Sequence, residues 1–345
     1  MTGPALVTGG SGFVAGHVVA QLLDEGREVR ASVRSLGNDD KVAPLRAIAE
    51  NRPGTLELFE ADLLSPGAFD EAMAGCTHVF HVASPFLMLE QIEDGRTDVF
   101  EPVMVGTASV LDAVDATPSV ERVVLTSTVG AIFGDYVDVL EMDDHTLSEK
   151  YFNTTSTLEN NPYHYAKTQA ELLAWDRAKA QDRWSMVTIN PGLILGPSIT
   201  GPSDSGSLFL LDELFRGEFF YGAPNFAFTF VDVRDVATAH LRAAATPSAS
   251  GRYILARPEM VSFLDMARIV RRKHRLQMRV PKHPVPDAAV RVLGPHFGLT
   301  QDYISKHLGI RFDVDNHRSI EELGIDYRPV ERTVLDHYAA WRRSR

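Results

Sequence analysis

The sequence contains a single cysteine, Cys76, among its 345 residues. An intrachain disulfide is therefore excluded, and a cysteine-based metal site would have too few ligands. No uninterrupted apolar stretch is long enough to cross a bilayer, and the first residues carry no basic targeting segment. These absences make the cytoplasm the expected compartment, with no membrane partner.

Positive charge is also scarce, because 34 Lys and Arg stand against 46 Asp and Glu, for a formal net charge of −12. An acidic surface repels phosphate backbones, so nucleic acid is not expected as a partner. The sequence lacks His-Glu-x-x-His, a phosphate loop with Gly-Lys-Ser, and a Gly-x-Ser-x-Gly elbow. No metal site is predicted, and His78 and His81 are expected to be packed core residues.

What the sequence does have is an alternation of short apolar runs with longer helical patterns over its first two-thirds. The predicted strands in this part are Ala5–Thr8, Glu28–Val33, Leu56–Glu60, His78–Val82, Arg122–Thr128 and Ser185–Asn190, with helices such as Gly12–Glu25 and Val99–Ala116 between them. After Asn190 the predicted elements are one strand, Phe226–Val231, and two helices, Arg234–Ala245 and Phe263–His274. This alternation predicts an α/β fold, a Rossmann-type doubly wound parallel sheet. At roughly 150 residues per domain, the length fits two units.

We expect the first unit to span 1–190 and a smaller C-terminal lobe to span 191–345, with segments near 226–256 returning to the sheet. The change of rhythm after Asn190, where Gly and Pro become frequent, marks this boundary. The segment 134–161 is long, acidic and turn-rich. Because loops of that length in compact domains are usually functional, we expect it to take part in the site.

A glycine-rich run, TGGSGFVAG, begins at Thr8 directly after the first strand and opens the first helix. Gly9 and Gly12 lie where the chain must turn tightly and let a pyrophosphate approach the backbone, and Ala15 is the third small position. The N–H groups at the helix start then face the phosphates. In this context the motif predicts a dinucleotide site.

The end of the second predicted strand distinguishes between the two nicotinamide cofactors. An NAD site uses an Asp or Glu there to bind the ribose hydroxyl, whereas this chain has Arg34. A guanidinium suits a 2′-phosphate by geometry and charge, which favours NADP(H). Arg30 and Lys41 are lesser candidates for the same role.

A tyrosine and a lysine four residues apart, Tyr163 and Lys167, share one face of a predicted helix, while Tyr165 points away from both. A phenol has an ordinary pKa of about 10, which a neighbouring ammonium and a positive nicotinamide ring lower toward the working range. The preceding strand ends in three hydroxyl residues, Thr126–Thr128, which can hydrogen-bond and polarise a carbonyl. Together these residues predict a proton-transfer site.

The sequence resembles the extended short-chain dehydrogenase/reductases, and within them the dihydroflavonol reductase, cinnamoyl-CoA reductase and methylglyoxal/ketone reductase subgroup. The resemblance covers nearly the whole chain. It rests on TGGSGFVAGH (8–17), ASVRS (31–35), ADL (61–63), GCTHVFHVASPF (75–86), VVLTST (123–128), YHYAKTQAE (163–171), NPGLILGP (190–197) and FVDVRDVATAH (230–240).

The resemblance implies a role for each matching position. Tyr163 would be the general acid, Lys167 would bind the nicotinamide ribose, and Thr128 falls where the family has its catalytic serine, with Ser127 left as the alternative. Phe86, Phe133 and the segment 134–161 would wall the substrate pocket. The implied cofactor-binding residues are Gly9, Gly12, Phe13, Val14, Arg34, Asp62, Leu63, Val82, Ala83, Ser84, Thr126, Tyr163, Lys167, Pro191, Gly192 and Leu193.

The sequence therefore predicts an NADPH-dependent reductase of ketones or aldehydes, reversible as an alcohol dehydrogenase, with an NADP-binding Rossmann domain and a substrate-binding lobe. The substrate is expected to be apolar or aromatic, and a homodimer through paired helices would fit the family. Two alternatives stay open. One is an NAD-dependent nucleotide-sugar epimerase or dehydratase on the same fold, which Arg34 disfavours; the other is a non-catalytic NADP(H)-sensing protein, which would need no tyrosine–lysine pair.

Overall fold

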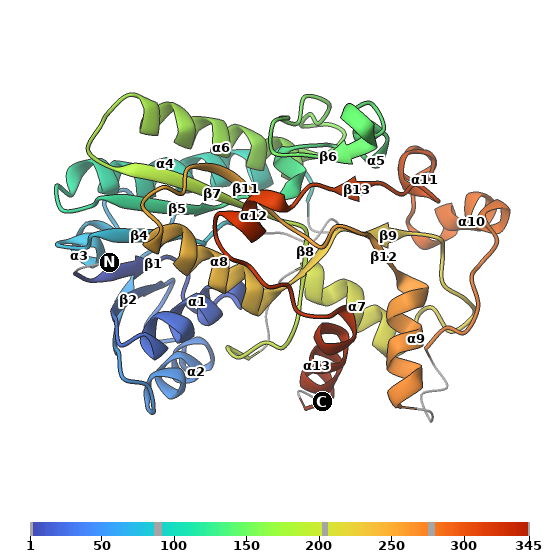
Figure 1. Cartoon of the computed structure of the whole chain (residues 1–345), viewed down its shortest axis with the longest axis horizontal. Coiled ribbons are helices and arrows are strands. Elements are labelled where there is room, and N and C mark those ends of the chain that lie inside the picture. Colours follow the sequence, from blue (N-terminus) through green and yellow to red (C-terminus); the bar gives the residue numbers. More distant parts are fainter. Residues whose placement is uncertain (1–2, 86–91, 202–205, 275–279, 344–345) are drawn as a thin grey trace.

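A seven-stranded parallel sheet forms the centre of the protein in the computed structural model, which describes residues 3–85, 92–201, 206–274 and 280–343 (Figure 1). The strand order is β11-β7-β5-β4-β1-β2-β3, and each neighbouring pair is parallel. The strands are β1 (Ala5–Val7), β2 (Glu28–Val33), β3 (Thr55–Glu60), β4 (His78–His81), β5 (Arg122–Thr126), β7 (Ser185–Pro191) and β11 (Gly251–Leu255). This arrangement confirms the predicted Rossmann-type sheet.

Helices cover both faces of the sheet, which is why its strands are nearly continuous apolar runs (Figure 1). One face carries α1 (Phe13–Asp24), α2 (Asp39–Ala49) and α8 (Val233–Ala245). The other carries α3 (Asp70–Met73), α4 (Glu101–Ala116) with its π-helical lead-in η2 (Gly95–Phe100), and α6 (Pro162–Lys179). Burying both faces of the sheet provides two layers of hydrophobic core.

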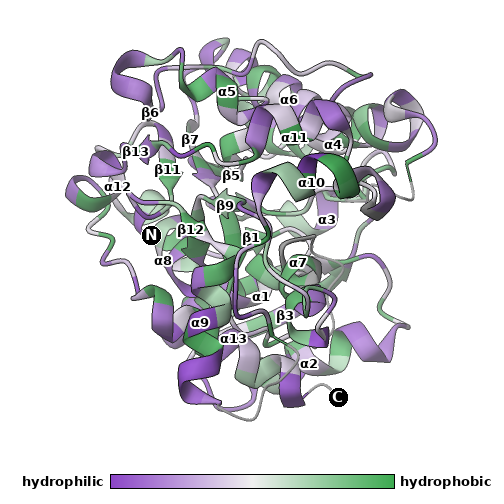
Figure 2. Cartoon of the chain, turned by 90° about the vertical axis from the view of Figure 1, so that its right-hand side faces the viewer, coloured by the Kyte–Doolittle hydropathy of each residue, from purple (hydrophilic) through white to green (hydrophobic). Residues whose placement is uncertain are grey.

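The rest of the chain forms a smaller lobe beside the carboxyl ends of the strands, with its own core around Phe215, Met266 and Tyr338. Its strand pairs are β8 (Leu193–Leu195) with β10 (Phe230–Asp232), and β9 (Ala227–Phe228) with β12 (Val261–Ser262). Its helices are α7 (Gly206–Arg216), α9 (Phe263–Lys273), α10 (Asp287–Leu293), α11 (Gln301–His307) and α13 (Val330–Arg343). Figure 2 shows this lobe from its outer side, where α9 presents hydrophilic residues.

The chain leaves the sheet after β7 and later returns to it. Asp232 caps the start of α8, which packs against α1, and β11 then joins the sheet beside β7. The buried guanidinium of Arg122 on β5 secures the return by donating to the carbonyls of Ala243 (3.1 Å) and Ala249 (2.7 Å). Residues 233–255 are therefore part of the sheet layers although they follow the first lobe segment.

Two predicted strands differ from the structure by more than one residue at an end. The fifth strand ends at Thr126 instead of residue 128, because the Thr128 hydroxyl accepts from the Gly130 N–H and starts the 3-10 turn η3 (Val129–Ala131). The single strand predicted over 226–231 is two strands, β9 and β10, since the chain changes partner strand at Thr229.

The segment 134–161, predicted as a loop, contains short elements of its own. They are α5 (Tyr136–Val139), η4 (Asp143–His145) and β6 (Thr146–Leu147). β6 pairs with β13 (Asp313–Val314) near the end of the chain. The remaining short elements are η5 (Gly294–Phe297) and α12 (His317–Glu321). None of the helices that the structure describes is long and apolar enough to span a membrane.

Candidate active site

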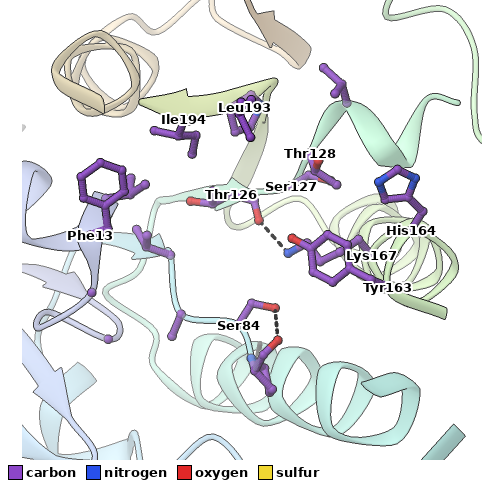
Figure 3. Close-up of a pocket in the computed structure, with 18 of the residues that line it drawn as sticks. Phe13, Ser84, Thr126, Ser127, Thr128, Tyr163, His164, Lys167, Leu193 and Ile194 are labelled. Atoms are coloured by element: carbon purple, nitrogen blue, oxygen red, sulfur yellow. Dashed lines mark hydrogen bonds between the residues drawn. The ribbon is translucent and has the colours of Figure 1, made fainter. Parts of the chain in front are cut away.

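A cavity of about 1450 Å³ opens at the carboxyl ends of the central strands, between the sheet and the smaller lobe (Figure 3). Ligands of doubly wound sheets bind at this edge. Phe86 lies outside the described residues. Apart from the lesser candidate Arg30, every other predicted site residue lines the cavity, namely Gly9, Gly12, Phe13, Val14, Arg34, Asp62, Leu63, Val82, Ala83, Ser84, Thr126, Ser127, Thr128, Phe133, Tyr163, Lys167, Pro191, Gly192 and Leu193.

The turn between β1 and α1 brings backbone to the cavity floor. Gly9 has a φ of +67°, which glycine adopts without a steric penalty, and a Cβ there would lie 2.9 Å from Ala83. The Gly9 N–H donates to the Ser32 hydroxyl (3.0 Å), and Gly12 directly precedes α1. The turn is thus a cradle that a side chain would fill, at the positive end of a helix dipole, as a pyrophosphate requires.

Arg34 follows β2 and lines the cavity with Ser35, Asn38 and Lys41. Arg30, the lesser candidate from the sequence, is directed elsewhere: its guanidinium donates to the carbonyl of Ala74 (2.7 Å). We call Gly9, Gly12, Ala83 and Arg34 the glycine-turn end of the cavity.

A buried hydroxyl, that of Thr8, holds the carboxyl end of β4 in place. The Thr8 hydroxyl accepts from the N–H groups of Val82 (3.0 Å) and Ala83 (2.9 Å), and it lies 3.1 Å from Nδ1 of His81. Because the hydroxyl accepts from both amides, its own hydrogen points to His81, whose Nδ1 accepts it. His81 is therefore a neutral core residue, as predicted, and burial lowers its pKa to about 3.

The tyrosine–lysine pair projects from α6 into the cavity, toward the end of β5 (Figure 3). Asn161 caps this helix by accepting from the His164 N–H (3.2 Å). The Lys167 ammonium donates to the carbonyl of Thr126 (3.0 Å). Tyr165 stacks on Phe100 instead of lining the cavity, with ring centroids 5.5 Å apart. Tyr165 therefore points away from Tyr163 and Lys167, as the helical spacing predicts.

The chain's own groups do not lower the pKa of the Tyr163 phenol, and the lowering expected from a positive nicotinamide ring stays a prediction. Burial raises the pKa of Tyr163 to about 12, because a phenolate is poorly solvated there. Burial also lowers the pKa of Lys167 to about 8, against the opposing effect of the Glu171 carboxylate. The phenol thus keeps its proton throughout the neutral range.

The three hydroxyls that follow β5 have different surroundings. Thr126 lies 2.7 Å from Nε2 of His240, and Ser127 donates to the buried carboxylate of Glu171 (2.5 Å). The Thr128 hydroxyl accepts from the Gly130 N–H (3.1 Å), which leaves its hydrogen available as a donor. Of the two residues left open by the sequence, Thr128 is the one whose donor is not used by Glu171.

The loop after β7 closes the cavity against β9 and β10. A Cβ at Gly192 would lie 2.6 Å from the carbonyl oxygen of Thr229, which accepts from the Leu193 N–H (2.7 Å). Glycine is therefore required for this close approach of two backbones.

The other end of the cavity is aromatic, and the sequence analysis covered Phe133 and, within the segment 134–161, Tyr136, but not Tyr303 or His307. Tyr303 and His307 on α11 stack at 4.1 Å, and His307 lies 4.5 Å from Tyr136 between ring centroids. Tyr136 in turn packs edge-on against Phe133 (5.9 Å). We call Phe133, Tyr136, Tyr303 and His307 the aromatic end.

An ion pair joins the two segments that build this end. Nζ of Lys306 on α11 lies 3.0 Å from Asp135, at the start of α5, and 2.7 Å from Asp302. The spacing of Tyr303 and His307 indicates a shared helix face, but nothing in the sequence places that face beside residue 136. Among the residues that the structure describes, no group of three or more His, Cys, Asp or Glu is arranged to hold a metal ion.

Comparison with known proteins agrees with this geometry. Residues 5–256 match the family described as the NAD dependent epimerase/dehydratase family. The chain belongs to this family. The match begins at β1 and ends just after β11, so it spans the central sheet and all of the strand ends that line the cavity.

Several similar proteins are reductases by name. A cinnamoyl-CoA reductase of Medicago truncatula is 32% identical over 96% of this chain and 93% of its own length. An anthocyanidin reductase of Vitis vinifera is 34% identical over 76% of this chain and 80% of its own. Gre2 of Candida albicans, solved in complex with NADPH, has a TM-score of 0.77 at 29% identity over 99% of each chain. These neighbours confirm the predicted subgroup.

Proposed function

We propose that this protein is an NADPH-dependent reductase of ketones or aldehydes, reversible as an alcohol dehydrogenase. The observation that carries the proposal is the Tyr163–Lys167 pair, which lines the same cavity as the Gly9–Gly12 turn and the Thr128 hydroxyl. The named relatives are reductases, and the yeast methylglyoxal/isovaleraldehyde reductase Gre2, solved with NADPH, has a TM-score of 0.75 at 25% identity.

The glycine-turn end fits a dinucleotide. The α1 N-terminus and the open turn at Gly9 suit a pyrophosphate, and Arg34 with Lys41 suits the 2′-phosphate that distinguishes NADPH from NADH. Asp62 and Leu63 would contact the adenine, Val82–Ser84 and Pro191–Leu193 would flank the rest of the cofactor, and Lys167 would bind the nicotinamide ribose. When bound there, NADPH supplies a hydride to the substrate carbon.

The proton comes from the chain itself. The Thr128 hydroxyl donates a hydrogen bond to the substrate oxygen, and Tyr163 transfers its phenolic proton to that oxygen as negative charge develops. A phenol with a pKa near 12 is fully protonated at neutral pH, which suits the direction of reduction. The Lys167 ammonium stabilises the phenolate that remains.

The aromatic end favours an apolar or aromatic substrate. Its walls are rings from Phe133, Tyr136, Tyr303 and His307, which offer contact area and stacking faces more than hydrogen bonds to sugar hydroxyls.

Replacing the proposed acid tests the proposal. Tyr163→Phe should lower kcat for NADPH-dependent carbonyl reduction at least about 100-fold, because the proton donor is lost. NADPH affinity should be nearly unchanged. The matched control is Tyr165→Phe, which removes the same hydroxyl from a ring that stacks on Phe100 outside the cavity, and it should retain wild-type turnover.

The measurement is NADPH oxidation against a panel of aldehydes, aryl ketones, keto esters and flavonoid ketones, with NADH in parallel. Wild-type turnover by Tyr163→Phe would overturn the assigned acid. Tightly bound NAD, with no NADPH consumed across the panel, would instead support a nucleotide-sugar epimerase or dehydratase.

A further inference from the structure

A buried carboxylate on α6 lies outside the proposed acid–base pair. Glu171 is one helical turn after Lys167 and only 1% exposed. Its Oε2 accepts from the hydroxyl of Ser127 (2.5 Å) and the amide of Asn190 (2.9 Å), and its Oε1 accepts from Arg252 (2.6 Å). Because one buried carboxylate accepts all of these hydrogen bonds, it fixes the positions of the groups that donate to it.

This carboxylate fixes the hydroxyl segment that follows β5. The Asn190 amide that donates to Glu171 also donates to the backbone carbonyl of Thr128 (3.1 Å). Lys167 holds the carbonyl of Thr126 from the same helix. Each residue of Thr126–Thr128 is thus bound to α6, either directly or through Asn190.

Arg252 compensates the buried carboxylate and extends the network. The guanidinium, which reaches Glu171 from β11, also donates to the carbonyls of Ala131 (3.1 Å) and Glu149 (3.1 Å). It lies over the ring of Phe152, 3.9 Å from its centroid. The same carboxylate is therefore linked to the segment 134–161, which contributes Tyr136 to the aromatic end of the cavity and Asp135 to the ion pair beside it.

Glu171 is also the carboxylate that acts on Lys167. Burial lowers the pKa of Lys167 to about 8, and the charge of Glu171 opposes that effect. The pair is one helical turn apart, so the two side chains share a face of α6.

The other titratable groups near Lys167 are uncharged at neutral pH. On β4, His81 has a pKa near 3; on α6 itself, His164 has a pKa near 4 and Tyr163 a pKa near 12. The helix η2 and α4 pack against α6 with the apolar side chains Val99 and Val103. Beyond Glu171, the charged partner in this network is Arg252, whose effect on a lysine is repulsive.

We propose that Glu171 is a positioning residue of the reductase site: through Ser127 and Asn190 it fixes the Thr126–Thr128 segment, and its negative charge, one helical turn away, stabilises the protonated form of Lys167. The inference rests on the proposed function, since it assumes that Lys167 binds the ribose of NADPH. It assigns Ser127 to the support of the site and leaves Thr128 as the hydroxyl that meets the substrate.

The test is the pH dependence of NADPH binding, followed by the fluorescence of the bound nucleotide. In Glu171→Gln, which keeps the shape but removes the charge, the alkaline loss of NADPH affinity should move to lower pH by about one unit. Affinity at pH 6, where Lys167 is protonated in either protein, should be unchanged. With a carbonyl substrate, kcat should fall more than the KM for NADPH changes, because the Thr126–Thr128 segment is loosened.

The control is Trp175→Phe, which removes one donor to the same carboxylate (Nε1 to Oε1, 3.3 Å) and leaves its charge. Its binding profile should match the wild type. Because Glu171→Gln leaves Arg252 buried without its ion pair, the double variant Glu171→Gln/Arg252→Gln, which removes both charges, is measured beside it. A shift in the same direction is expected, but a smaller one, because the repulsion between Arg252 and Lys167 is removed as well.

The outcomes separate the two proposals. A folded Glu171→Gln variant that binds NADPH with the wild-type pH profile, or a folded double variant whose kcat for carbonyl reduction is unchanged, would overturn the role of Glu171 and leave the reductase intact. A wild-type protein that does not bind NADPH would overturn the proposed function, and this inference with it.

Discussion

The glycine-turn end and the aromatic end of the cavity share one space but are built in different ways. The first consists of backbone turns directly after the strands β1, β2 and β4, and its shape depends on the φ of Gly9 and on close approach to Ala83. The second consists of side chains on α5 and α11, far apart in the sequence and joined by ring stacking and an ion pair. Backbone turns tolerate few substitutions, whereas side-chain walls can change one residue at a time.

The largest effect should come from filling the glycine turn. Gly9→Val should weaken NADPH binding about 100-fold, because the residue is strained at a positive φ and its side chain meets Ala83. Gly26→Val is the control, since Gly26 also has a positive φ (+74°) but its Cβ would meet no heavy atom within 4 Å. It should lower the melting temperature and leave the NADPH Kd unchanged. Equal losses of affinity in both variants would contradict the special role of the turn.

A tenfold effect is expected from replacing Arg34, which also belongs to the glycine-turn end. Arg34→Ser should raise the KM for NADPH about tenfold, because a charge-assisted contact to the 2′-phosphate is lost, and added salt should shrink the difference. The KM for NADH, which lacks that phosphate, is the internal control and should not change. If the KM values for NADPH and NADH rise together, Arg34 stabilises the fold and does not recognise the 2′-phosphate.

The smallest effect is expected at the aromatic end. Lys306→Met removes the ion pairs to Asp135 and Asp302, which are partly exposed and each worth about 1 kcal/mol or less. The KM for the carbonyl substrate should change about two- to fivefold, with the KM for NADPH unchanged. Lys150→Met, which removes an exposed ion pair to Asp143 in the same 134–161 segment, should change neither constant. An effect of Lys306→Met on NADPH alone would contradict the division of the cavity.

The same contrast explains what could be predicted from the sequence. The sheet, the glycine turn, Arg34 and the Tyr163–Lys167 pair depend on short spacings within one strand, turn or helix, so local pattern is sufficient to find them. The stacking of Tyr136 on His307 and the link from Glu171 to Arg252 join residues that are distant in the chain. No local sequence pattern indicates such contacts. The division of residues 226–231 into β9 and β10 could not be predicted for the same reason, because a change of partner strand does not alter the pattern of apolar residues within the segment.

The placement of β11 has a consequence for how the protein is made. Glu171 leaves the ribosome 81 residues before Arg252, the cation that compensates it in the finished structure. In a nascent chain that ends between these two residues, the Glu171 carboxylate has no Arg252 guanidinium to pair with, so its burial would be strongly unfavourable. We therefore expect the strand ends around Ser127 to become ordered late, after the edge strand has docked, so that a half-synthesised chain has most of its sheet but no working centre.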